Sequence, residues 1–170
     1  MNAKEASTGP SAKPLTATST PYYTLVDGQL CIGPIIETTQ LGADCEVIYG
    51  FSNKCQYDNF CIGKQSTLKP YPLTKVYLRN QVEKQDTGLR LLVTDAAGPD
   101  ESQLHAATMM AVLEAHENHL PLVTASYRLI LQPETTMYRL HEAFELSVDE
   151  EETVSTSPDV IDTNTTRHEK

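Results

Sequence analysis

The chain has 170 residues, a formal net charge of −10 and 39% apolar residues. This length predicts one domain with tails rather than several domains. No stretch approaches the roughly 20 consecutive apolar residues of a membrane helix, and the first residues lack the apolar segment of a secretory signal. These features exclude a protein held in a membrane by a helix. We expect a cytoplasmic protein with no membrane partner.

Both ends of the sequence have the composition of tails. Residues 1–21 are mostly Ser, Thr, Ala, Pro and Lys, and residues 149–170 are acidic and rich in Ser and Thr. Such segments bury too little apolar surface to offset the entropy lost on ordering. We therefore expect disordered tails over 1–21 and 149–170 around a single α+β domain over 22–148.

The domain begins with a predicted β-hairpin. Two apolar runs, Tyr22–Val26 and Gln29–Ile32, flank Asp27-Gly28, a dipeptide typical of a tight type I′ turn. Three further segments are a strand at Cys45–Phe51, a polar turn at Ser52–Asn59 and a strand at Thr74–Arg79.

The clearest pattern is a strand–helix–strand unit over 88–132. Strands are predicted at Leu89–Asp95 and Leu122–Gln132, and the main helix at Glu101–Asn118. Asp100 and Gln103 form a capping-box pattern at the start of that helix. Its interior, residues 106–113, is apolar almost all round, as in a helix covered on most sides.

The segment 137–148 fits either a strand or a helix. Tyr-Arg-Leu occurs at both 127–129 and 138–140, which favours a strand paired in a hairpin around the loop Pro133–Thr136. The order of elements predicts an α+β fold. Its sheet is small and mostly antiparallel, packed on the helix 101–118, or closed into an OB-like barrel.

The cysteines and histidines do not form a recognised metal motif. The spacing of the four cysteines matches no zinc knuckle, so we interpret them as ordinary thiols, with a zinc site or a disulfide as alternatives. On the predicted helix His105 and His116 would lie roughly 16 Å apart, too far to share an ion. His116 and His119 would need a third ligand from elsewhere. We therefore predict no metal and no cofactor. The four cysteines are Cys31, Cys45, Cys55 and Cys61.

Three acids between the first strand and the helix are candidates for hydrolysis. Asp95, Asp100 and Glu101 gather where the carboxylates of a metal-dependent hydrolase often lie. Capping already accounts for Asp100 and Glu101, and no phosphate-binding loop or nucleophile motif is present. We expect no catalytic residues, and keep a small metal-dependent hydrolase as a second alternative.

The most function-like feature is a basic, aromatic middle region. Residues 54–84 contain six bases and two acids, whereas residues 142–170 contain nine acids and two bases. Cations neutralise phosphates and rings stack on bases, so their mixture is typical of proteins that bind single-stranded nucleic acid. The candidate nucleic-acid-binding residues are Lys54, Tyr57, Phe60, Lys64, Lys69, Tyr71, Lys75, Tyr77 and Arg79.

These observations predict a non-enzymatic accessory protein that binds single-stranded DNA or RNA. Lys75, Tyr77 and Arg79 would share one strand face, and the acidic tail would compete for the same groove. The negative charge of the whole chain opposes binding to polyanions. The alternative is therefore a protein-interaction or assembly module, with a protein partner or a homo-oligomer and no role in nucleic-acid binding.

Overall fold

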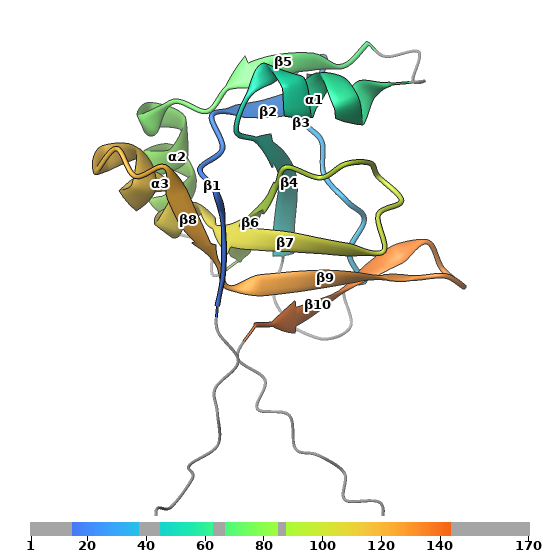
Figure 1. The fold of residues 1–170 in the computed structure, drawn as a ribbon. Helices are drawn as coiled ribbons and strands as arrows, with labels where there is room; N and C mark the ends of the chain where they lie inside the picture. Colours follow the sequence, from blue (N-terminus) through green and yellow to red (C-terminus); the bar gives the residue numbers. More distant parts are fainter. Residues whose placement is uncertain (1–14, 38–44, 63–66, 85–87, 144–170) are drawn as a thin grey trace, which may run out of the picture.

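The computed structural model describes residues 15–37, 45–62, 67–84 and 88–143, which form ten strands and three helices (Figure 1). The strands are β1 (Thr16–Ser19), β2 (Tyr23–Asp27), β3 (Leu30–Cys31), β4 (Cys45–Phe51), β5 (Lys69–Pro72), β6 (Leu89–Thr94), β7 (Gln103–Thr108), β8 (Leu122–Ala125), β9 (Tyr127–Gln132) and β10 (Met137–Glu142). The helices are α1 (Lys54–Cys61), α2 (Lys75–Val82) and α3 (Met109–Glu117). None of these helices is long and apolar enough to cross a bilayer.

Eight strands form one sheet in the order β10-β9-β7-β6-β4-β2-β3, with β5 paired to β2. Among its described strand pairs only β4 and β6 run parallel. Strands β1 and β8 form a separate antiparallel pair. The expected α+β fold with a mostly antiparallel sheet is therefore confirmed.

The central strands are buried on both faces, and neighbouring residues of one strand enter different cores because successive side chains point to opposite sides of a sheet. Leu91 and Val93 of β6 lie in a core with α1, β9 and β10. Leu92, between them, lies in a second core with α2, α3 and β8. Figure 1 shows α2 and α3 together on one side of the molecule, with α1 at its top. The two cores account for the nearly continuous apolar sequence of β6.

The segment that follows β3 links the two ends of the sheet. The Ile32 N–H donates to the Leu25 carbonyl oxygen (3.0 Å), and the Glu37 N–H donates to the Tyr138 carbonyl oxygen of β10 (2.9 Å). Gly33 lies so close to β4 that a Cβ atom would be 1.8 Å from the Val47 carbonyl oxygen. Only glycine therefore fits this crossing. An OB-like barrel, which has one main helix between its third and fourth strands, stays a prediction.

The predicted helix Glu101–Asn118 is wrong over its first half. Residues 103–108 form β7, which pairs with both β6 and β9. The helix α3 begins at Met109, where the N-cap is Thr108 rather than Asp100, and its hydroxyl accepts the Ala111 N–H (3.1 Å). Pairing on both sides of β7 outweighs the helix propensity of its alanines.

Two predictions in the basic middle region are also wrong. The polar turn at Ser52–Asn59 is largely helix α1, capped by Asn53. The strand at Thr74–Arg79 is largely helix α2, in which Thr74 accepts the Tyr77 N–H (3.1 Å). Both caps are residues that favour helix starts, and capping with tertiary packing outweighs the alternating pattern read from the sequence.

Strands β4, β6 and β10 lie where the sequence predicts strands, and β9 and β10 form the expected hairpin. The predicted strand Leu122–Gln132 is broken at Ser126 into β8 and β9. The first hairpin is also present, but its two loop residues are Gly28 and Gln29. Only Gly28 of these has a positive φ (64°), which is the pattern of a type II′ turn rather than type I′.

The folded part begins earlier than Tyr22, because Thr16–Ser19 pair with β8 as strand β1. Residues 1–14 and 144–170, which include the rest of the predicted tails, lie outside the described residues.

Candidate functional site

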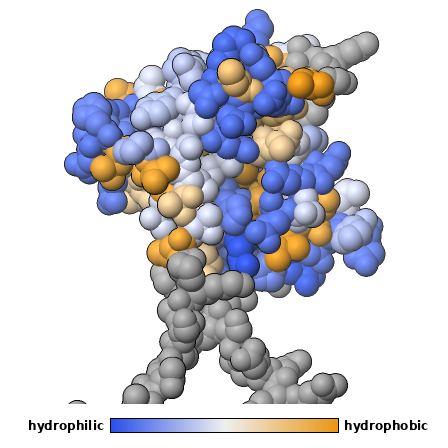
Figure 2. Space-filling model, viewed as in Figure 1, coloured by the Kyte–Doolittle hydropathy of each residue, from blue (hydrophilic) through white to orange (hydrophobic). Residues whose placement is uncertain are grey.

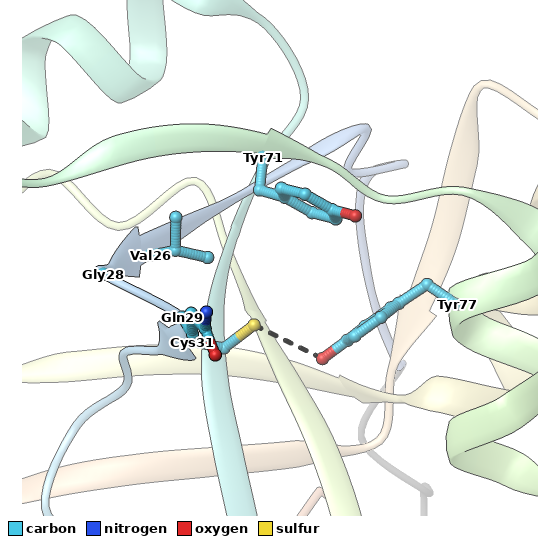
Figure 3. Close-up of a pocket in the computed structure, with 6 residues that line it drawn as sticks. All are labelled: Val26, Gly28, Gln29, Cys31, Tyr71 and Tyr77. Atoms are coloured by element: carbon cyan, nitrogen blue, oxygen red, sulfur yellow. Dashed lines mark hydrogen bonds between the residues drawn. The ribbon is translucent and has the colours of Figure 1, made fainter.

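A pocket of about 330 Å³ lies between the β2–β3 hairpin, β5 and α2 (Figure 3). Figure 3 shows the ring of Tyr77 reaching from α2 towards the sulfur of Cys31, with the ring of Tyr71 above them on β5. Its walls are aromatic and aliphatic with few polar groups, as is usual for sites that bind small planar ligands. The lining residues are Val26, Gly28, Gln29, Cys31, Tyr71 and Tyr77.

Strand register places Lys69 on the same face of β5 as Tyr71. Lys69 pairs with Val26, and Tyr71 pairs with Thr24. Leu25, between these two β2 residues, points into the core, so Lys69, Tyr71 and Val26 point to the opposite face, where the pocket lies. The ring of Tyr71 is 50% exposed. A cation and an open aromatic ring therefore lie side by side at the pocket.

The outer edge of β5 has few main-chain donors. Leu73 directs its N–H towards β2, where it donates to the Tyr22 carbonyl oxygen (2.9 Å). Backbone nitrogens of successive residues point to opposite edges of a strand, so those of Pro70 and Pro72 point away from β2. Proline carries no N–H. This edge cannot pair with a further strand through those positions. A ligand at this edge of β5 therefore finds no main-chain donor at Pro70 or Pro72.

Tyr77 is held in place by Cys31. The Tyr77 hydroxyl lies 3.4 Å from the Cys31 sulfur, and either atom can donate the hydrogen bond. Burial raises the pKa of Tyr77 well above its ordinary value, and the hydrogen bond with Cys31 raises it further. The hydroxyl consequently keeps its proton at neutral pH and remains a donor inside the pocket.

Of the nine predicted residues, the structure brings Tyr71 and Tyr77 together at the pocket, and Lys69 lies two residues from Tyr71 on the same face of β5. Lys75 and Arg79 also lie on α2, but residues two apart on a helix point in nearly opposite directions. The expected strand face of Lys75, Tyr77 and Arg79 is therefore wrong. Arg79 forms an ion pair with Glu117 (2.6 Å).

The three predicted residues on α1 have other roles. Lys54 forms an ion pair with Asp58 (2.6 Å). Phe60 is 2% exposed and lies in the core with Tyr49 and Phe51, and Tyr57 packs against the same core. Phe60 therefore cannot stack on a base. Lys64 lies outside the described residues.

Asp95 serves to connect two strand ends. Its carboxylate accepts the backbone N–H and the hydroxyl of Ser52, both at 2.7 Å, and its own N–H donates to the Gly50 carbonyl oxygen (2.9 Å). Its φ of 48° is left-handed, a conformation that Asp tolerates better than most residues. Glu101 accepts the Ala97 N–H (2.8 Å) in the loop before β7. These contacts give both carboxylates structural roles.

The described residues contain no group of three His, Cys, Asp or Glu side chains placed to hold one metal ion. None of the four cysteines is in a disulfide. His105 lies on β7, so its predicted position on one helix with His116 is wrong. His116 is buried, and its Nε2 lies 2.7 Å from the Pro21 carbonyl oxygen.

Sequence reasoning missed the contribution of the hairpin to the pocket. Gly28 and Gln29 were predicted only as hairpin residues, and Cys31 only as one of four thiols. The contact between Cys31 and Tyr77 spans 46 positions. No local pattern signals a contact of that separation, and the wrong strand at 74–79 concealed it.

Comparison of the chain with known protein families, with curated proteins and with solved structures finds no match.

Proposed function

We propose that this protein is a non-enzymatic, cytoplasmic binding protein for single-stranded nucleic acid, with the Lys69–Tyr71–Tyr77 pocket as its site. The observation that carries the proposal is the shared face of Lys69 and Tyr71 beside the pocket. A base stacks on the half-exposed Tyr71 ring, and Lys69 neutralises a neighbouring phosphate. The absence of disulfides among the four cysteines agrees with a reducing compartment.

The hydrogen-bonding groups of the pocket suit the edge of a base. The Tyr77 hydroxyl, which forms one hydrogen bond with Cys31, offers an oxygen lone pair as an acceptor, and the Gln29 amide offers both donors and an acceptor. We also propose that the acidic residues after 142 compete with nucleic acid for Lys69. A chain ending at Ser147 then binds more tightly than the full chain.

Fluorescence anisotropy of a labelled single-stranded oligonucleotide at several salt concentrations tests this proposal. We expect Tyr71→Ala to weaken binding by about 1–3 kcal/mol, the contribution of one stacked base. We expect Lys69→Ala to reduce the slope of log K against log salt by about 0.7, the share of one phosphate contact. Lys54→Ala is the matched control, because Lys54 is already paired with Asp58.

Lack of binding by the wild-type chain would exclude this function. Equal losses in Lys54→Ala and Lys69→Ala would show that net charge alone drives binding, and would exclude the pocket as its site.

Exposed apolar side chains favour a protein-interaction or assembly module as a second candidate. Leu30 is 75% exposed and Val76 is 65% exposed, each adjacent in sequence to a residue of the pocket. On the face seen in Figure 2, apolar residues form separate small patches rather than one continuous surface. Sedimentation of the wild-type chain and of Leu30→Asn checks this candidate. Dimerisation that the substitution abolishes would support it, and a monomer at every concentration would exclude it.

A further inference from the structure

A row of three basic side chains crosses the sheet at β7, β9 and β10. His105 pairs directly with Arg128, and Arg128 pairs directly with His141. Directly paired residues of adjacent strands project on the same face, with Cβ atoms about 4.5–5.5 Å apart. The register therefore places His105, Arg128 and His141 side by side, with the arginine in the middle.

This row lies on the face of the sheet opposite the core that contains Phe60, the face on which Ala107 of β7 joins the second core. Leu104, Leu129 and Leu140, the neighbours of the three residues along their strands, all lie in the core inside the sheet, so the row points the other way. The three basic side chains are half-buried. Figure 1 shows β7, β9 and β10 in the lower part of the molecule, with β7 leading into α3 at Met109.

Two N–H groups in this row are buried without an acceptor. The Gln103 Nε2 amide lies 3.3 Å from Nε2 of His105 and can only donate, so His105 Nε2 accepts. The neutral imidazole then carries its proton on Nδ1. That Nδ1 and the Nε of Arg128 are buried and have no hydrogen-bond partner. A buried donor without an acceptor is unfavourable, and here two of them lie on paired residues.

In the described part of the chain, the charged side chains near Arg128 pair elsewhere. Arg139, one row further along β10, pairs with Glu37 (3.1 Å). Within the described residues no acidic side chain forms an ion pair with Arg128. The other near neighbours on β9, Ser126 and Ile130, carry no charge. None of the described residues supplies an acceptor for the N–H groups of His105 and Arg128, and an anion is the natural acceptor for these two groups.

We propose that His105, Arg128 and His141 form a binding site for a phosphate group. The guanidinium of Arg128 offers parallel N–H donors that match phosphate oxygens, and the orphan Nδ1 of His105 lies on the adjacent strand β7. Because neither orphan nitrogen is open to solvent, the Arg128 side chain rotates to admit the oxyanion. The site lies on other strands than the Lys69–Tyr71–Tyr77 pocket and does not depend on the function proposed for that pocket.

Nuclear magnetic resonance of the arginine Nε–H groups in the full chain tests this site directly. We expect inorganic phosphate to shift the Nε–H resonance of Arg128 and to leave that of Arg139 in place. Arg128→Gln should weaken phosphate binding about tenfold or more, as expected for the loss of a charge-assisted hydrogen bond. Arg139→Gln is the matched control on the same face and should bind phosphate like the wild type.

A second arm replaces phosphate by a short single-stranded oligonucleotide without terminal phosphates. A shift of the Arg128 resonance by inorganic phosphate identifies a free phosphate group as the ligand, and a shift by the oligonucleotide alone identifies a nucleic-acid backbone. No shift in either arm, or equal loss in Arg128→Gln and Arg139→Gln, would overturn the proposal. Should Arg128→Gln fail to fold, His105→Gln serves instead, with a smaller loss of affinity expected.

Discussion

Replacing Asp95 tests how the ends of β4 and β6 are held together. Asp95→Ala removes two hydrogen bonds of 2.7 Å from Ser52 to a carboxylate, and places Ala at a φ of 48°. Hydrogen bonds to charged groups contribute about 1.5–3 kcal/mol each. Because Asp95 is half-buried, water recovers part of this, and we expect a loss of about 3 kcal/mol in the free energy of unfolding.

Two further substitutions at Asp95 separate the hydrogen bonds from the backbone strain. Asp95→Gly loses the same hydrogen bonds but relieves the left-handed conformation, so it should be less destabilising than Asp95→Ala by about 0.5–1 kcal/mol. Asp95→Asn retains an acceptor and tolerates this φ, and should lose only about 1 kcal/mol.

Urea unfolding followed by circular dichroism measures all three variants against the wild type. The reasoning would be refuted if Asp95→Ala were as stable as the wild type. It would also be refuted if Asp95→Gly were less stable than Asp95→Ala, since strain would then have no part in the effect.

Two other substitutions test the closure of the sheet. Gly33→Ala places a Cβ 1.8 Å from the Val47 carbonyl oxygen. Because backbone cannot move aside as a side chain does, we expect a loss of about 3 kcal/mol or more in the free energy of unfolding, measured in urea. An unchanged urea midpoint would contradict the close contact at Gly33. The Tyr138 hydroxyl lies 2.7 Å from two carbonyl oxygens, those of Pro99 and Glu101, so Tyr138→Phe should lose about 1–2 kcal/mol at neutral pH. Burial, with nearby acids, raises the pKa of Tyr138 to about 12, so between about pH 10 and that value the unfolded chain releases this proton and the folded chain keeps it. Wild-type stability therefore falls with rising pH in that window, and the fall should be shallower in Tyr138→Phe; parallel stability curves for the two proteins would contradict this assignment.

Strands buried on both faces were the easiest elements to predict. Leu89–Thr94 is apolar because both cores need its side chains, and such a run is recognisable without knowing its partners. The β9–β10 hairpin was predictable from the repeated Tyr-Arg-Leu and its turn. The failure at 103–108 arises because Ala106 and Ala107 continue directly into the apolar start of α3, so the sequence carries no period there that separates strand from helix.

The two missed helices did carry local signals. Asn53 and Thr74 are good N-caps, and Tyr57, Phe60 and Cys61 show the three- and four-residue spacing of a helix face. The alternation at 75–79 instead predicts a strand, in which Val76 and Leu78 would share one face. In the structure Val76 is 65% exposed and Leu78 is fully buried.

The candidate site could be predicted only in part. Lys69, Tyr71 and Tyr77 were identified by residue type, since cations among rings suit nucleic acid whatever the local fold. Their partners on the β2–β3 hairpin were not, because tertiary structure alone joins them. The row at His105, Arg128 and His141 was beyond sequence reasoning for the same reason, since it depends on the register of three strands.

The crossing segment and strand β1 also bear on how fast this chain folds. Glu37 binds Arg139 across 102 positions, and Thr18 binds Val123 across 105. Chain entropy must be lost before such distant contacts form, so proteins rich in them fold in milliseconds to seconds rather than microseconds. During synthesis Thr18 of β1 and Glu37 wait for partners that leave the ribosome 105 and 102 residues later. The interval in which the sheet remains open is therefore set by translation as much as by the chain itself.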